Sequence, residues 1–306
     1  MRNAFSHFYR RLRHSSLAWH AINTPARLRY FFARSPLTPV EARAVDDLEK
    51  TGIAIAHVSD LCAPGIFPEL LNYANERLAN PEVTSRLQRL VRLGAGGSKT
   101  KNSFLVDLWG GEHILDPTHP FIRFSLSQPV LSVVNGYLGM FSKFREFFLQ
   151  ATAPIPAGTM PFASQRWHAD PDDRKLVKIF LYLNDVDETA GPLSYIRYSH
   201  SAGKWRDFFP YAPKIKSRHP DPAMIERIIP PEDIAVAAGK AGTIIFCDTS
   251  GVHRGGYATG RERIMYTSVY TSRASALPTR FRCLSDSPDN MFEAPAARYA
   301  AIARKL

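Results

Sequence analysis

His168 and Asp170 stand two positions apart in the segment 165–170. On an extended strand, side chains at positions i and i+2 leave the same face, so this imidazole and this carboxylate can reach one metal ion. His253 follows 85 residues later, just beyond a short apolar run. Two histidines and one carboxylate on neighbouring strands form the ligand set of non-heme iron(II) sites, which leaves three octahedral positions open. The sequence therefore predicts an iron site made of His168, Asp170 and His253.

A His-x-Asp pair by itself is weak evidence for a metal. A second copy occurs at His219-Pro220-Asp221, in a proline-rich stretch where a regular strand is not expected. A lone histidine in a strand is more often a hydrogen-bonded core residue, and Asp170 alone also fits a cap of the turn that follows it. The metal interpretation depends on the combination of the first pair with His253.

The elements that must position these residues are short strands. Residues 175–183, 243–247 and 263–271 are rich in Ile, Val, Phe, Tyr and Thr, and turn residues bound them. No helix alternates regularly with these strands, which disfavours a parallel sheet and favours a two-sheet antiparallel roll.

Helices are expected before and between the strands. Residues 36–93 are predicted to be mostly helical, with a helix start at the Thr-Pro-Val-Glu sequence of residues 38–41 and a short strand at residues 52–56. The Gly-rich residues 94–98 are expected to be a linker. A further helical segment is expected near residues 129–148.

An ordered set of residues between positions 101 and 271 resembles a known family. The set consists of His168-x-Asp170, Ala190-Gly191-Pro192-Leu193 leading to Ser199-His200, Gly242-Thr243, His253 and Arg263. In this order it is similar to the phytanoyl-CoA dioxygenase family of iron(II)- and 2-oxoglutarate-dependent oxygenases. One departure is Arg197-Tyr198, because the family often has Pro-Gly before Ser-His.

The resemblance implies an α+β protein with a mainly β core, a double-stranded β-helix (jelly roll, cupin-like) with N-terminal helices packed around it. It implies that His168, Asp170 and His253 bind iron(II), that Arg263 binds the distal carboxylate of the cosubstrate 2-oxoglutarate, and that dioxygen is consumed. A buried carboxylate needs a counter-charge, and a bidentate guanidinium is the expected partner. Arg263 is preferred to Arg261 because Arg261 is expected to belong to a turn.

The implied reaction is oxidative decarboxylation of 2-oxoglutarate to succinate and carbon dioxide, with hydroxylation of an unactivated C–H bond in a small-molecule or carrier-linked metabolite. Related halogenases have a small residue in place of the carboxylate, so Asp170 favours hydroxylation. Two alternatives stay open. One is a metal-dependent isomerase or hydrolase on a cupin-like barrel, which does not need Arg263. The other is a non-catalytic β-roll that binds a partner or a membrane through the basic arm.

Several neighbours of the predicted ligands have two interpretations. Trp167 and Phe180 fit either a wall of the cosubstrate pocket or ordinary core aromatics. Asn184 and Asp185, together with Gln165, are candidates to orient the ligands, because a metal-bound histidine normally donates its other N–H to an acceptor. His200 and Cys247 are expected to be structural.

The net charge of +11, from 39 basic and 28 acidic residues, is concentrated at the N-terminus. Residues 1–40 contain seven arginines and no Asp or Glu, so this arm fits a basic helix packed on the body or a contact with an anionic membrane surface. The rest of the chain is only mildly basic, and nucleic-acid binding is not expected. Basic residues in a long loop suggest an anionic or carrier-linked substrate: Lys204, Arg206, Lys214, Lys216 and Arg218.

We expect four regions. They are a basic arm (1–40), a helical segment packed on the core (41–100), the oxygenase core (101–272) with a lid or insert loop at 200–233, and a C-terminal tail with a helix (273–306). No apolar run is long enough to span a bilayer, and no secretory signal is recognised. The three cysteines form no Cys-x-x-Cys pair, which favours a reducing, cytoplasmic location.

Overall fold

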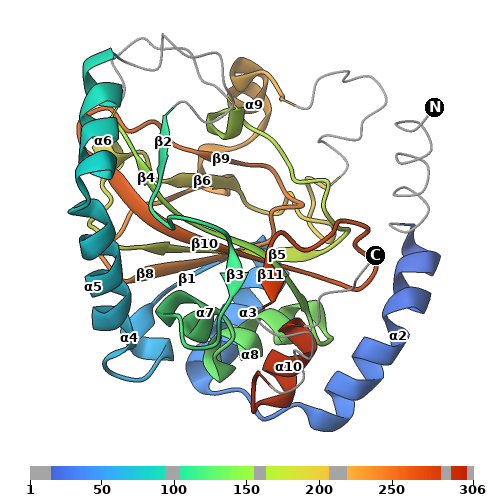
Figure 1. Ribbon diagram of the computed structural model, residues 1–306. Coiled ribbons are helices and arrows are strands. Elements are labelled where there is room, and N and C mark those ends of the chain that lie inside the picture. The colour runs from blue at the N-terminus through green and yellow to red at the C-terminus, as the bar shows by residue number, and fades with distance from the viewer. Residues whose placement is uncertain (1–14, 94–103, 155–162, 207–218, 284–290, 302–306) are drawn as a thin grey trace, which may run out of the picture.

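Two antiparallel sheets form the centre of the computed structural model, which describes residues 15–93, 104–154, 163–206, 219–283 and 291–301 (Figure 1). The strand order of the larger sheet is β1 (Ile53–His57), β8 (Thr243–Cys247), β5 (Leu176–Tyr182), β10 (Arg263–Thr271), β4 (Lys143–Thr152) and β2 (Leu105–Asp107). The order of the smaller sheet is β7 (Ile234–Ala237), β6 (Leu193–Ile196) and β9 (His253–Gly255). A short parallel pair joins β3 (Ile114–Leu115) to β11 (Arg282–Cys283).

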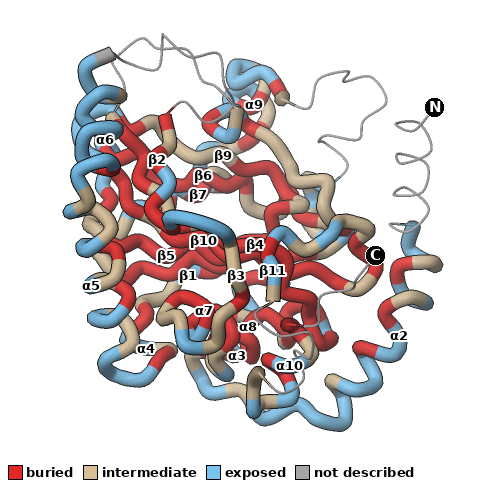
Figure 2. Tube along the Cα trace, viewed as in Figure 1, coloured by how far each residue is buried: buried red, intermediate tan, exposed pale blue. Residues whose placement is uncertain are grey.

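Both faces of the larger sheet are buried, as the tube in Figure 2 shows. In β5, Val177, Ile179 and Leu181 belong to the core that the helices complete. Tyr182 has the opposite parity and belongs to a second core shared with the smaller sheet. Its hydroxyl donates a hydrogen bond to the Ala237 carbonyl of β7 at 2.9 Å, which ties the two sheets together.

Helices cover the face of the larger sheet that points away from the smaller one (Figure 1). They are α2 (Ser16–Ala33), α3 (Pro39–Thr51), α4 (Val58–Leu61), α5 (Ile66–Leu78), α6 (Pro81–Leu93), α7 (Pro120–Ser125), α8 (Gln128–Leu138) and α10 (Pro295–Ala301). On the opposite side, α9 (Pro222–Ile228) packs against the outside of the smaller sheet. Single-turn 3₁₀ helices are η2 (Ala163–Gln165), η3 (Glu188–Ala190) and η4 (Pro231–Asp233).

The predicted start of α3 is confirmed in atomic detail. The Thr38 hydroxyl accepts a hydrogen bond from the Glu41 amide, and the Glu41 carboxylate accepts one from the Thr38 amide, so this is a complete capping box. The helix ends at Gly52, whose φ of 84° is a left-handed conformation that favours glycine. The strand predicted directly after it is β1.

The prediction of a helix near residues 129–148 is wrong in its second half. The helix α8 ends at Gly139 (φ 66°), and Lys143–Thr152 is the strand β4. This strand pairs with β10 on one side and β2 on the other. Half of its residues are polar or charged, and the apolar residues Phe144, Phe147, Phe148 and Ala151 have the i, i+3, i+4, i+7 spacing of a helix face, so tertiary pairing decides in favour of the strand.

The insert predicted at 200–233 contains the helix α9, whose N-terminus is capped by the Asp221 side chain. The linker predicted at 94–98 and the first 14 residues of the basic arm lie outside the described residues. The described helices and antiparallel sheets confirm the α+β class. Within that part of the chain, every helix is too short or too polar to cross a membrane.

Candidate metal centre

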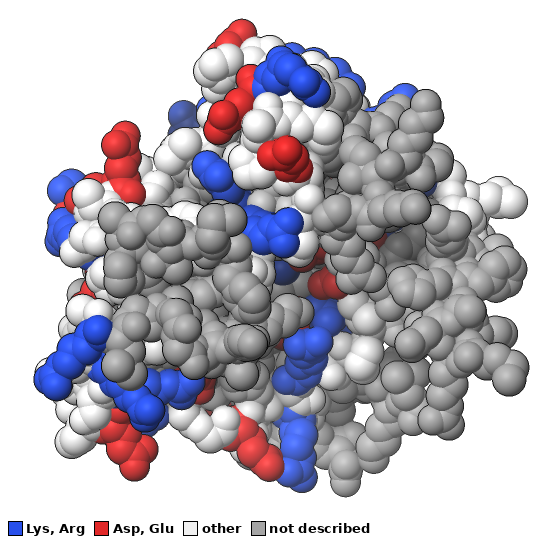
Figure 3. Space-filling model, turned by 90° about the horizontal axis from the view of Figure 1, so that it is seen from above, with Lys and Arg blue, Asp and Glu red and all other residues white. Residues whose placement is uncertain are grey.

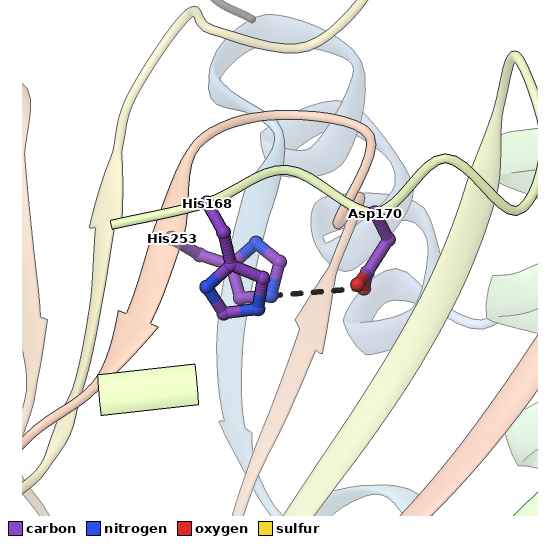
Figure 4. A group of neighbouring side chains, drawn as sticks. All are labelled: His168, Asp170 and His253. Atoms are coloured by element: carbon purple, nitrogen blue, oxygen red, sulfur yellow. Dashed lines mark ion pairs between the residues drawn. The ribbon is translucent and has the colours of Figure 1, made fainter. Parts of the chain in front are cut away.

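His168 and His253 lie opposite each other on adjacent extended segments (Figure 4). Each backbone amide donates to the other residue's carbonyl, at 2.9 Å from His168 and 2.8 Å from His253. Two residues further on, the Asp170 amide donates to the carbonyl of Thr249, in the turn after β8, at 2.7 Å. The backbone thus fixes the places of the three predicted ligands independently of their side chains.

The three side chains converge. His253 Nε2 lies 3.7 Å from Asp170 Oδ2, and the two imidazole centroids are 4.3 Å apart. One ligand atom from each of His168, Asp170 and His253 lies within 4.8 Å of the other two. Among the described residues, this is the group that offers a metal three convergent donor atoms.

Backbone carbonyls select the tautomer of both histidines. His168 Nδ1 lies 2.8 Å from the Arg166 carbonyl, and His253 Nδ1 lies 3.0 Å from the Gly251 carbonyl. Because a carbonyl oxygen only accepts, each Nδ1 carries the proton and donates it. Each Nε2 therefore keeps its lone pair, as a metal-binding histidine requires.

Burial and charge hold all three groups in the protonation states that bind metals. Desolvation lowers the pKa of His253 to about 3, with the His168 imidazole adding to the effect. Desolvation also lowers the pKa of His168, so both imidazoles are neutral at pH 7. Burial alone would raise the pKa of the Asp170 carboxyl, but the Lys178 ammonium and the two imidazoles hold it well below its usual range. The site thus presents two neutral nitrogen donors and one carboxylate.

Lys178 was not predicted as a site residue. Its Nζ lies 2.7 Å from Asp170 Oδ2, and both side chains are largely buried. Lys178 belongs to β5 and has the same parity as Tyr182, so it points toward the smaller sheet and the ligands. The signal in the sequence is a single charge inside an apolar run, Leu-Val-Lys-Ile-Phe-Leu-Tyr, where an unpaired ammonium would be costly.

Arg263, at the start of β10, is buried among the strands and lacks a carboxylate partner within the described residues. Its Nη2 donates to Thr152 Oγ1 at 3.4 Å, whereas Nε and Nη1 have no hydrogen-bond partner in that part of the chain. A buried guanidinium with two N–H donors that lack an acceptor destabilises the folded state unless an anion accepts those hydrogen bonds. Since a carboxylate binds a guanidinium through two parallel hydrogen bonds, Arg263 fits one end of a dicarboxylate.

Gly255 connects the two halves of the site. It lies two residues after His253 on β9, so the two positions face the same way. A Cβ built on Gly255 would lie 3.6 Å from Arg263 Nη2. The Arg263 guanidinium therefore lies beside Gly255. On this face of β9, Gly255 is the neighbouring position to His253, about 7 Å further along the strand. The residues present fit a metal ion together with a dicarboxylate that reaches from it to Arg263.

A comparison with family models matches residues 56–265 to the description "Phytanoyl-CoA dioxygenase (PhyH)". The match covers more than half of the chain. The chain belongs to the phytanoyl-CoA dioxygenase family. This confirms the resemblance seen in the sequence, and the matched range contains all three converging ligands and Arg263.

Solved structures support the same fold. EctD from S. alaskensis with 2-oxoglutarate and 5-hydroxyectoine is 18% identical over 87% of this chain and 90% of that chain, with a TM-score of 0.55. EctD with bound Fe is 17% identical over 88% and 89%, with a TM-score of 0.52. The epimerase SnoN in complex with Fe3+, alpha ketoglutarate and nogalamycin RO is 16% identical over 76% and 83%, with a TM-score of 0.51. No curated protein matches.

Asn184 and Asp185, two of the three candidates to orient the ligands, have structural contacts instead. Asn184 bridges the Glu262 carbonyl and the Ile264 amide, and Asp185 binds Lys240 and the Ala241 amide, so these side chains orient the strand ends. The acceptors that orient the ligands are the two backbone carbonyls instead. Arg261 lies in the turn, as predicted, and its Nη1 lies 3.4 Å from Asp187 Oδ2.

The aromatic and histidine candidates divide between the two cores. Trp167 packs with Ile196 and α9 outside the smaller sheet, whereas Phe180 lies inside, on the face that carries Lys178. His200 has a structural role, with Nε2 3.2 Å from the Glu49 carbonyl. Burial raises the pKa of the Cys247 thiol well above its usual value, so this cysteine is inert.

The second His-x-Asp pair lies closer to the site than expected. The His219 ring centroid is 6.2 Å from that of His168, and its Nδ1 lies 3.2 Å from the Trp167 carbonyl. Asp221 does not join it, because its side chain caps α9. The described segment 219–233 of the insert therefore begins close to the candidate metal centre.

Proposed function

We propose that this protein is an iron(II)- and 2-oxoglutarate-dependent dioxygenase that hydroxylates an unactivated C–H bond of a small-molecule or carrier-linked metabolite. The observation that carries the proposal is the pairing of a two-histidine, one-carboxylate group with a buried guanidinium that has no carboxylate partner among the described residues. A metal-dependent isomerase or hydrolase needs the first of these features but has no use for the second.

In this proposal His168, Asp170 and His253 hold iron(II), which activates dioxygen when 2-oxoglutarate and substrate are bound. The Arg166 and Gly251 carbonyls keep the two imidazoles oriented through their Nδ1 protons. Arg263 binds the distal carboxylate and so fixes the end of the cosubstrate that points away from the metal. The two facing sheets act as a double-stranded β-helix that keeps these groups rigid and excludes water.

Hydroxylation is the proposed outcome because the ligand set includes Asp170. A carboxylate that occupies a coordination position leaves no place for a halide ion, so the family's halogenation route is disfavoured. The epimerase SnoN shows that this fold also hosts another outcome, which makes product analysis essential.

The proposed substrate is anionic or attached to an anionic carrier. Figure 3 shows Lys and Arg side chains, with some Asp and Glu side chains among them, along the described strip of the upper face between the segments drawn in grey. Of the five basic residues that suggested such a substrate, Lys204 forms an ion pair with Asp233, at 2.7 Å, and three lie outside the described residues: Lys214, Lys216 and Arg218. A cytoplasmic location is proposed from the three free thiols.

The test begins with binding. Under anaerobic conditions, iron(II) and 2-oxoglutarate should together produce the visible absorption of a chelated 2-oxo acid in the wild-type protein but not in His168→Ala. His20→Ala, at an exposed histidine on α2, is the matched control and should retain the absorption. Metabolite pools are then screened for substrate-dependent release of succinate. A protein that binds iron(II) but shows no 2-oxoglutarate-dependent absorption would favour the isomerase or hydrolase alternative.

A further inference from the structure

Helix α2 is attached to the body by one face only. Trp19, Asn23 and Ala26 are buried. Trp19 Nε1 donates to Asp173 Oδ1 at 2.8 Å, and Asn23 Oδ1 accepts from the Ala274 amide at 3.1 Å. These buried hydrogen bonds fix the rotation of the helix about its axis, so the direction of its outer face is determined.

The outer face of α2 is apolar except for Thr24. With about 100° of rotation per residue, five exposed apolar side chains fall within roughly 100° of arc on the side of the helix opposite the buried face. They are Leu17, Ala21, Leu28, Phe31 and Phe32, named here the α2 stripe. Leu17 is 85% exposed, Leu28 55%, Phe31 61% and Phe32 81%. Four large apolar side chains gathered on one exposed face are unusual for a surface that faces water alone.

Arginines flank the stripe on both sides. Arg27 lies on one flank of the helix and Arg29 on the other. Arg34 follows the end of the helix, and its Cζ lies 5.4 Å from the centroid of the Phe31 ring. None of the three forms an ion pair with a carboxylate of the described residues. Residues 1–40 contain no Asp or Glu at all. Positive charge therefore borders the stripe, and its own segment contributes no acidic residue.

A groove continues the apolar surface toward the body. It lies between α2 and the helices α3 and α8 and has a volume of about 850 Å³. Leu28, Phe31, Leu37 and Val45 contribute its apolar walls, and Arg27 and Arg34 also line it. No acidic side chain lines the groove within the described residues. Apolar walls suit the acyl chain of a lipid, and the guanidinium groups beside them suit its anionic headgroup.

We propose that α2 docks the protein on an anionic membrane surface, with the α2 stripe inserted among the headgroups and upper acyl segments. The arginines at the flanks extend their apolar stems along the stripe and place their guanidinium groups at the level of the phosphates. The helix lies in the plane of the surface and does not span the bilayer. This inference is independent of the metal centre, because no member of the stripe contacts the three ligands.

The charge pattern favours a membrane over a second copy of this chain. A symmetric dimer through the stripe would bring the arginines of both copies together, and no acidic residue of this segment would offset them. An anionic bilayer satisfies both the apolar stripe and its positive borders. Binding should therefore depend on anionic lipid and weaken with salt.

The test is co-sedimentation of the full-length protein with vesicles of phosphatidylcholine alone and with vesicles containing one third phosphatidylglycerol. Wild-type protein should bind the anionic vesicles and should not bind the neutral ones. A higher salt concentration should release the protein from the anionic vesicles. The double variants Phe31→Ser/Phe32→Ser and Arg29→Gln/Arg34→Gln should each weaken binding by at least tenfold. These side chains are exposed, so thermal unfolding should be close to that of the wild type.

Matched controls distinguish binding through the α2 stripe from binding through exposed apolar or basic residues elsewhere on the protein. Val236→Ser removes another exposed apolar side chain, 54% exposed on β7, and Arg86→Gln/Arg89→Gln removes two exposed arginines of α6; both should bind like the wild type. Equal binding to neutral and anionic vesicles, no binding, or no loss in the α2 variants would overturn the proposal. Light scattering completes the test: a wild-type dimer that Phe31→Ser/Phe32→Ser converts to a monomer would assign the stripe to a second copy instead.

Discussion

Lys178 Nζ and His253 Nε2 approach the same oxygen of Asp170, at 2.7 and 3.7 Å. The Asp170 carboxylate thus lies between the Lys178 ammonium on β5 and His253 Nε2, the nitrogen that would bind the same metal ion. An ammonium in this place compensates the charge of Asp170 when the carboxylate is buried. It also opposes a second cation, because like charges a few ångströms apart repel strongly in a protein interior.

This relationship predicts the behaviour of Lys178→Met. Removing one partner of a buried pair leaves the other charge uncompensated, so the metal-free variant should lose about 3 kcal/mol of unfolding free energy. A divalent metal then supplies the missing positive charge. The increase in Tm on adding cobalt(II) or iron(II) should therefore be larger in Lys178→Met than in the wild type.

Lys178→Arg is the control for that experiment, since it keeps the charge, and its metal-induced increase in Tm should stay close to that of the wild type. If the increase in Lys178→Met equals or falls below the wild-type value, Lys178 does not oppose the metal.

Arg263→Met should separate stability from cosubstrate binding. Replacing a buried guanidinium that lacks a counter-charge by an apolar side chain is expected to leave the unfolding free energy unchanged or to raise it. The affinity for 2-oxoglutarate should fall by about thirtyfold or more, because truncating one partner of a buried charge pair costs about 2–5 kcal/mol. Calorimetry with 2-oxoglutarate and with metal alone measures the two effects. A loss of metal binding in Arg263→Met would contradict the separate roles given to the two halves of the site.

Gly255 should be sensitive to side-chain size. A Cβ there makes an ordinary contact 3.6 Å from Arg263 Nη2, so Gly255→Ala should be tolerated. Gly255→Leu places a large group in front of the guanidinium and should reduce 2-oxoglutarate affinity at least tenfold, with metal affinity unchanged. Equal cosubstrate affinity in the two variants would show that the dicarboxylate takes another path through the site.

The stability of the metal-free protein should fall in acid, partly through His253. Its pKa is about 3 in the folded protein and near 6.5 in the unfolded chain. Below pH 6.5 the unfolded chain takes up a proton that the folded site rejects. The contribution of His253 to stability is thus fully present above pH 6.5 and is lost as the pH falls toward 3, by up to about 1.4 kcal/mol per pH unit.

His253→Gln removes this titration. Denaturation curves in the presence of a chelator, at several pH values between 7 and 4, should show a shallower loss of stability in the variant than in the wild type. Other titrating groups contribute to both proteins, so the difference between the two slopes isolates His253. Parallel slopes would mean that the imidazole is readily protonated in the folded state.

The sequence alone determined the local features of this protein. Thr38 and Glu41 form the predicted capping box because the motif uses only neighbouring backbone groups. The predicted apolar runs form the strands β5, β8 and β10, because β-branched and aromatic residues bounded by turn residues favour a buried strand. Residue type, order and spacing also singled out His168, Asp170, His253 and Arg263 as candidate site residues, in an order that resembles the family whose model the chain matches.

Only the tertiary structure decided which distant groups meet. The segment Lys143–Thr152 is a strand because β10 and β2 lie on either side of it, although the spacing of its apolar residues also fits a helix. Lys178 is recognised as a partner of Asp170 only when β5 is placed beneath the ligand segment, and the open donors of Arg263 appear only when the strands around it are in place. The physical reason is that periodicity and turn chemistry act over a few residues, whereas a site depends on contacts between strands that are far apart in the chain.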